Sequence, residues 1–103
     1  MILDDLAGVR AGDKGDTLIL AVHVRDRADL PRVLATTTPQ RVAAHFDGLL
    51  TAPVIVREVP DQSAVVVVLP GALGGGVTGS ATLDGHGKAL GHHLLSLEVP
   101  DGP

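Results

Sequence analysis

Two runs rich in aliphatic residues constrain the fold more than any other feature of this sequence. They are TLILAVHVR at Thr17–Arg25 and SAVVVVL at Ser63–Leu69. Each run is long enough for a strand, and its continuity argues against a strand with one face in water. We therefore predict two buried strands, of which Thr17–Arg25 lies in the centre of a sheet.

The length and composition leave room for one core. In 103 residues we expect a single domain over residues 1–99, followed by a disordered tail at 100–103. Hydrophobic residues make up 45% of the chain, yet Phe46 is the only aromatic residue, so Val, Leu, Ile and Ala must build the core. A chain of this size buries only part of its apolar surface, and further burial in an oligomer would be unsurprising.

Charge and hydropathy argue against several classes of function. Eight basic residues face twelve acidic ones, no basic run occurs, and aromatic stacking platforms are lacking, so nucleic acid is not expected as a partner. No segment reaches the roughly 20 apolar residues of a membrane span, and no secretory leader is evident, which predicts a cytoplasmic protein away from membranes. The absence of cysteine excludes thiolate chemistry and disulfides.

The remaining segments complete a pattern of strands and helices. A short helical turn is predicted over Pro31–Ala35 with Asp29 as its cap, and Thr38-Pro39 begins a helix that extends to about Leu49. The buried face of this second helix would carry Val42, His45, Phe46 and Leu49.

The second half of the chain predicts a hairpin, a helix and a strand. Pro53–Val59 and Ser63–Leu69 form the hairpin, a further helix lies between Val77 and Leu95, and a short strand ends at Val99. The order strand, helix, strand, strand, helix, strand is the ferredoxin-like split βαβ pattern (βαββαβ) of an α+β fold. An extra N-terminal strand over Ile2–Val9, joined through Gly12–Asp16, is also compatible with the sequence.

The first candidate loop is Gly12-Asp13-Lys14-Gly15-Asp16, followed by Thr17. Its glycines permit positive φ, so backbone N–H groups could converge on an anion beside the Lys14 cation. Asp13, Lys14 and Asp16 are the candidate acid–base groups, and Gly12, Gly15 and Thr17 are candidate ligand-binding residues. A tight turn whose aspartates cap backbone amides is an equally good interpretation.

The second candidate loop, Gly71 to Thr78, follows a buried strand. Glycines at four positions let a ligand approach the main chain, and a helix starting at Val77 would add its positive end. Phosphate, carboxylate or a coenzyme A tail would fit. We take as ligand-binding candidates Gly71, Gly74, Gly75, Gly76 and Thr78. The alternative is a flexible connection or close packing at a subunit contact.

We expect the two loops at opposite ends of the sheet, separated by roughly 20–30 Å, because a strand of seven to nine residues rises about 3.3 Å per residue. One monomer would then hold two sites, or an oligomer or partner would complete one.

The histidines suggest neither a metal nor a cofactor. His86, His92 and His93 are read as solvated surface residues, because adjacent side chains diverge and no carboxylate follows at ligand spacing. His23 and His45 are read as hydrogen-bonded core or interface residues. No constellation for nucleophilic hydrolysis stands out.

Four stretches in this order resemble the small C-terminal domain of acyclic terpene utilisation protein A, AtuA. They are RAGDKGDT at Arg10–Thr17, RVAA at Arg41–Ala44, VLPGALGGGVT at Val68–Thr78 and GKALG at Gly87–Gly91. The resemblance implies a ferredoxin-like domain that works beside a large AtuA-like protein in the breakdown of acyclic isoprenoids or related acyl-CoA compounds. Relatives tend to carry polar groups where this chain has Ala11, Leu18, Ile19, Val66 and Gly79.

Two hypotheses follow from the loops and the resemblance. In the first, the chain is an accessory domain or small subunit that contributes its glycine-rich loops to a carboxylate- or CoA-binding site at an interface. In the second, it is an independent homo-oligomeric lyase or isomerase that uses Asp13, Lys14 or Asp16. A purely structural oligomerisation module is a third, plainer possibility.

Overall fold

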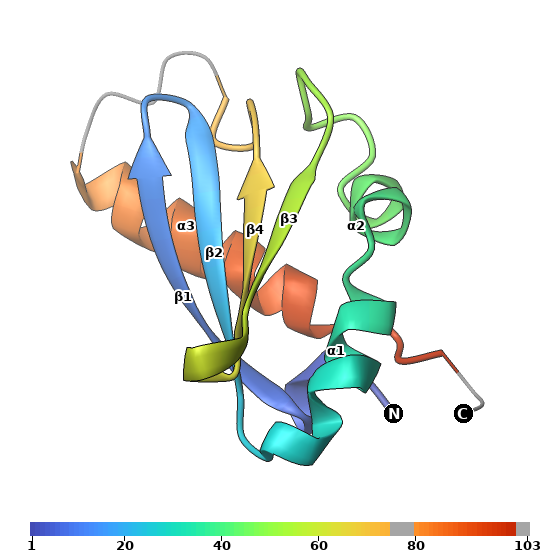
Figure 1. The fold of residues 1–103 in the computed structure, drawn as a ribbon. Helices are drawn as coiled ribbons and strands as arrows, with labels where there is room; N and C mark the ends of the chain where they lie inside the picture. The colour runs from blue at the N-terminus through green and yellow to red at the C-terminus, as the bar shows by residue number, and fades with distance from the viewer. Residues whose placement is uncertain (75–79, 101–103) are drawn as a thin grey trace.

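The computed structural model describes residues 1–74 and 80–100, and for 80–86 it describes the backbone alone. Its strands and α-helices are, in chain order, β1 (Ala7–Lys14), β2 (Thr17–Val24), α1 (Leu30–Thr36), α2 (Pro39–His45), β3 (Ile55–Val59), β4 (Ala64–Leu69) and α3 (Ser80–Leu95). Three short 3-10 helices, η1 to η3, occupy Leu3–Asp5, Arg27–Asp29 and Pro60–Gln62. In Figure 1, α3 crosses behind the sheet while α1 and α2 lie beside it.

The four strands form one antiparallel sheet in the order β1-β2-β4-β3. Because β4 pairs antiparallel with both β2 and β3, these two strands run parallel to each other with β4 between them. The chain connects β2 to β3 through α1 and α2, which is a split βαβ unit. The predicted α+β, ferredoxin-like class is thereby confirmed, with Thr17–Val24 as an inner strand.

The edge of the sheet beside β2 is occupied by the N-terminal part of the chain. β1 pairs with β2 along its whole length, from Ala7 opposite Val24 to Lys14 opposite Thr17. The predicted last strand up to Val99 is therefore wrong, since that edge is already taken. Within residues 96–100, β pairing is limited to an isolated bridge between Glu98 and Ile2.

The N-terminal strand is displaced from its predicted range of Ile2–Val9. Leu3–Asp5 form a 3-10 helix, and the strand runs instead from Ala7 to Lys14. Its second half is exposed at the sheet edge. Residues 10–14 are polar or small and show no alternation of apolar side chains, which is the pattern that predicts a strand. Their sequence therefore predicts a turn at Gly12–Lys14, where the structure has a strand.

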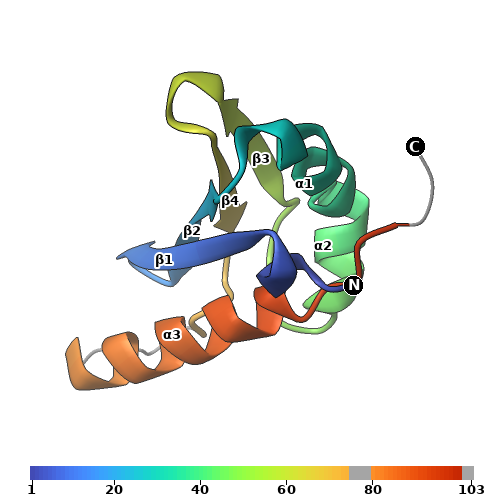
Figure 2. The ribbon, with the colours of Figure 1, turned by 90° about the horizontal axis from the view of Figure 1, so that it is seen from below.

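The helices α1, α2 and α3 lie on one face of the sheet, as the end-on view of Figure 2 shows. The side chains of β2 alternate, and Leu18, Leu20 and Val22 point into the core between sheet and helices. Val65, Val67 and Leu69 of β4 do the same, so β4 is more buried than β3, as predicted.

The helical connection begins close to its predicted bounds but ends earlier than predicted. Thr38 caps α2, because its hydroxyl accepts a hydrogen bond from the Arg41 N–H at 3.3 Å. Asp29 precedes α1 without a capping hydrogen bond, so that part of the prediction is wrong. The helix α2 ends at His45 and not at Leu49, whose side chain is 42% exposed, whereas Phe46 is buried.

Candidate functional site

The two candidate loops meet at one end of the sheet. The backbone N–H of Leu73 donates a hydrogen bond of 3.1 Å to the carbonyl of Asp16. The expectation of opposite ends is wrong, because β2 and β4 are antiparallel neighbours and Leu18 near the start of β2 pairs with Leu69 at the end of β4. A single chain therefore presents both loops on one surface.

The first loop is shorter than its glycines suggested. Gly12, Asp13 and Lys14 belong to β1, and only Gly15 and Asp16 make the turn, with Gly15 at a φ of 63°. In the part of the chain that the structure describes, no side-chain hydrogen bond or ion pair involves Asp13, Lys14 or Asp16. The two aspartates thus do not cap backbone amides there, and all three charged side chains are exposed to solvent.

The second loop starts as a compact turn that belongs to the core. Its backbone is closed by a hydrogen bond of 2.9 Å from the Gly74 N–H to the Gly71 carbonyl. Ala72 and Leu73 between them are buried. Gly71 and Gly74 have φ values of 82° and 77°, which accounts for glycine at both positions without a ligand. The remaining candidates Gly75, Gly76 and Thr78 lie outside the described residues.

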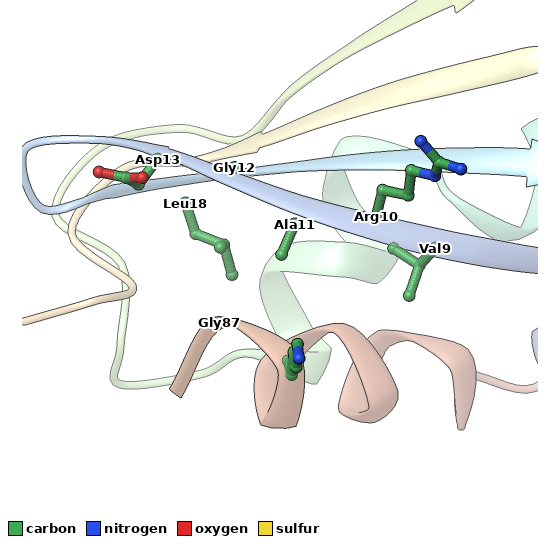
Figure 3. A pocket seen from close by; sticks show the side chains of 8 residues that line it. Val9, Arg10, Ala11, Gly12, Asp13, Leu18 and Gly87 are labelled. Atoms are coloured by element: carbon green, nitrogen blue, oxygen red, sulfur yellow. The ribbon is translucent and has the colours of Figure 1, made fainter. Parts of the chain in front are cut away.

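A cavity of about 350 Å³ lies between β1 and α3, next to the first loop (Figure 3). It is lined by Val9, Arg10, Ala11, Gly12, Asp13, Leu18, Gly87 and Lys88. Only Gly12 and Asp13 among these were predicted site residues. This volume is near the lower end of the range for small-molecule pockets, roughly 300–1,000 Å³.

The cavity has an apolar floor and a charged rim. Figure 3 shows the side chains of Val9, Ala11 and Leu18 on the side of β1 and β2 that faces α3. A second hollow of about 260 Å³ shares Val9, Ala11, Gly87 and Lys88 with the first and continues along the helix. Such a groove could hold an apolar chain whose polar end lies near the rim.

Two glycines of α3 line this groove, Gly87 in both hollows and Gly91 in the second, and neither was a predicted site residue. A Cβ on Gly87 would lie 3.6 Å from side-chain carbons of Ala11 and Leu18, and one on Gly91 would lie 3.2 Å from Val9 Cγ1. Their spacing of four residues on a helix places both on the face toward the sheet. On a helix over residues 80–95, this spacing is the sequence signal that points to both glycines.

We expect Gly87→Ala to raise the free energy of unfolding by about 0.5–1 kcal/mol, because alanine favours the helix and its Cβ makes ordinary contacts. Gly91→Ala gains the same helix propensity but crowds Val9, so its gain should be smaller. Urea unfolding followed by circular dichroism measures both. A Gly87→Ala protein less stable than the parent chain would contradict this packing of α3.

The histidines whose side chains the structure describes are a stacked pair, His45 and His93, and the exposed His23 and His92, while the side chain of His86 lies outside the described part of the chain. The rings of His45 and His93 stack with centroids 4.0 Å apart, and each Nε2 lies 2.7 Å from the backbone carbonyl of the other residue. Since a carbonyl only accepts, both Nε2 atoms carry a proton. The prediction for His45 holds, whereas His93 is not simply solvated. His23 is exposed and has no hydrogen bond within the described chain, against expectation.

The described residues offer neither a metal cluster nor a membrane-spanning helix. They contain no group of three or more His, Cys, Asp or Glu side chains that could hold a metal ion. No helix in the described part of the chain has both the length and the apolar character to span a bilayer.

Comparison with protein families gives one match that covers nearly the whole chain. Residues 1–100 match the model described as AtuA ferredoxin-like domain. Comparisons with curated proteins and with solved structures gave no match.

Proposed function

This chain belongs to the AtuA ferredoxin-like domain family, and from that premise we propose that it serves as an accessory domain or small subunit of an AtuA-like system. The system would act in the cytoplasm on acyclic isoprenoids or related acyl-CoA compounds, and a large AtuA-like protein would be the partner. In this proposal the two loops contribute to a carboxylate- or CoA-binding site at the interface with that partner.

The observation that carries the proposal is the hydrogen bond between Leu73 and Asp16, which joins the loops into one surface. Lys14 supplies an exposed cation at the loop end of β1, and Asp13, its neighbour in sequence, lines the apolar groove between β1 and α3. A carboxylate or phosphate near Lys14 with an acyl chain in the groove would match the charge and the apolar floor.

The exposure of the first loop supports a site that a partner completes. Residues 10–16 are all exposed, whereas small-molecule sites bury about 70–90% of the ligand. The alternative, an independent lyase or isomerase, requires an oriented acid–base group. None of Asp13, Lys14 and Asp16 has a side-chain partner within the described residues, so nothing in the structure favours this alternative.

We expect native mass spectrometry of the chain co-expressed with the large AtuA-like protein of the same genome to detect a hetero-complex. Isothermal titration of that complex should then detect binding of coenzyme A or a branched acyl-CoA. A homo-oligomer that does not bind the large protein would contradict the proposal.

Lys14→Ala is expected to weaken binding of the acyl-CoA probe by about tenfold, because it removes a charged hydrogen-bond donor. Arg32→Ala on α1 is the matched control and should leave the affinity unchanged. Equal affinities of the Lys14→Ala and Arg32→Ala complexes would remove Lys14 from the site.

A further inference from the structure

The face of the sheet opposite the helices is covered by no element of the described chain (Figure 2). The register places side chains of all four strands on this open face in cross-strand rows. One row consists of Arg10, Ala21, Val66 and Arg57, in that order across the sheet. The next row contains Ile19, Val68 and Ile55, and Ile55 is 49% exposed. The open face is therefore apolar in the middle and has an arginine at each edge.

Two glycines of β1 lie on this open face, and neither the backbone conformation nor the packing of the described chain requires glycine at these positions. Gly8 and Gly12 stand two residues before and after Arg10, so they share its side of the strand. Neither has a positive φ, and a Cβ would meet no atom within 4 Å at Gly8 and only the Ile19 carbonyl at 3.9 Å at Gly12. Glycine weakens a strand, and where internal packing does not require it, a close approach of another backbone is a known cause.

The basic residues divide into four that are engaged and four that are not. Arg25, Arg27, Arg32 and Arg41 each hydrogen-bond to another part of the chain. Arg10 and Arg57 have no hydrogen-bond or ion-pair partner in the described part of the chain, nor do Lys14 and Lys88. Figure 3 shows the Arg10 side chain on the side of β1 away from α3.

The charges on the open face select the kind of partner. Every acidic residue of the four strands faces the helix side, as the pairing of Asp13 with buried Leu18 and of Glu58 with buried Val65 shows. Arg10 and Arg57 are three strand spacings apart, about 14 Å between Cα atoms. A second copy of this chain on the same face would bring four arginines together without a carboxylate, which is unfavourable. Nucleic acid is disfavoured because the face has no aromatic ring for stacking.

We propose that the open face docks a protein surface that is apolar at its centre and carries carboxylates placed to reach Arg10 and Arg57. The main chain of that surface lies against Gly8 and Gly12. This inference rests on the proposed function, because it takes the large AtuA-like protein as the occupant. It assigns the open face to assembly and the groove on the other side of β1 to the ligand, with Arg10 and Gly12 of β1 bordering both.

The test measures the affinity between purified variants and the large AtuA-like protein by titration calorimetry. Gly8→Val adds a β-branched side chain where the chain itself leaves open space, so the isolated protein stays folded. We expect this variant to lose the complex, with affinity lowered at least about a hundredfold. Arg10→Glu and Arg57→Glu should each weaken it by about tenfold or more, and the weakening should shrink at high salt.

The control is Arg32→Glu, a charge reversal on α1, which should bind as the parent chain does. Parent-like affinity of Gly8→Val and both arginine variants would overturn the docking inference while a parent complex that binds acyl-CoA still supports the proposed function. No complex with the parent chain would overturn both. A homodimer of the parent chain that Gly8→Val disrupts would also overturn the inference, because the occupant would be a second copy.

Discussion

Replacing Phe46 with alanine is expected to lower the free energy of unfolding by about 3–5 kcal/mol. Phe46 is 1% exposed and is the only Phe, Tyr or Trp of the chain, so its truncation leaves the largest side-chain cavity that a single core substitution can make here. Its ring also meets the rings of His45 and His93 edge-on, at centroid distances of 5.8 and 5.0 Å. The loss is comparable to the whole stability of a small domain.

Urea unfolding followed by circular dichroism measures this effect, with Leu49→Ala as the matched control. Leu49 follows the same helix but is 42% exposed, and its truncation should change stability by no more than about 0.5 kcal/mol. If both variants lost similar amounts, the assignment of Phe46 to the core would be wrong.

Gly71→Ala is expected to cost about 2–5 kcal/mol, because two separate penalties act at one position. The φ of 82° strains any residue with a Cβ, and that Cβ would lie 2.5 Å from Thr51 Cγ2 and 2.6 Å from Thr51 Oγ1. Rotation of the threonine relieves the clash only in part, since its own Cβ would still be 3.0 Å away. The Thr51 backbone is held by a hydrogen bond of 2.9 Å to the Pro70 carbonyl.

Gly74→Ala separates the two penalties. Gly74 has a similar φ of 77°, but a Cβ there meets nothing within 4 Å, so this variant should lose only the conformational part, about 1 kcal/mol. Adding Thr51→Gly to Gly71→Ala should recover most of the difference between the two alanine variants. Equal losses for Gly71→Ala and Gly74→Ala in urea titrations would mean that the contact with Thr51 is not rigid.

The inner strands and the ferredoxin-like class could be predicted because buried strands consist mainly of aliphatic residues. The runs around Leu20 and Val67 are almost entirely aliphatic, so they were expected in the middle of the sheet. β1 could not be found this way. Arg10–Lys14 are polar or small because they lie at an exposed edge, and edge strands need no apolar alternation.

The candidate site was only partly accessible from the sequence. The two loops were found through their glycines, but their meeting at Asp16 and Leu73 follows from strand direction, which composition does not reveal. Gly71 has a structural role, because its positive φ closes a turn, and a glycine in a ligand-binding loop would give the same sequence pattern. The groove depends on the packing of Gly87 and Gly91 against the sheet, and that contact exists only once α3 and β1 are placed together.

The ends of the described chain are hydrogen-bonded to each other, with Val99 N–H donating to the Met1 carbonyl at 3.0 Å and Leu3 N–H to the Leu97 carbonyl at 2.8 Å. Figure 1 places the N-terminus away from the β1–β2 turn. A circular permutant that closed this junction and opened the Gly15–Asp16 turn would read strand, helical segment, strand, strand, helix, strand, with every strand in its present place. The same sheet is thus compatible with two orders of its strands along the chain. A tether attached at Met1 would leave the end of the sheet that carries the two loops unobstructed.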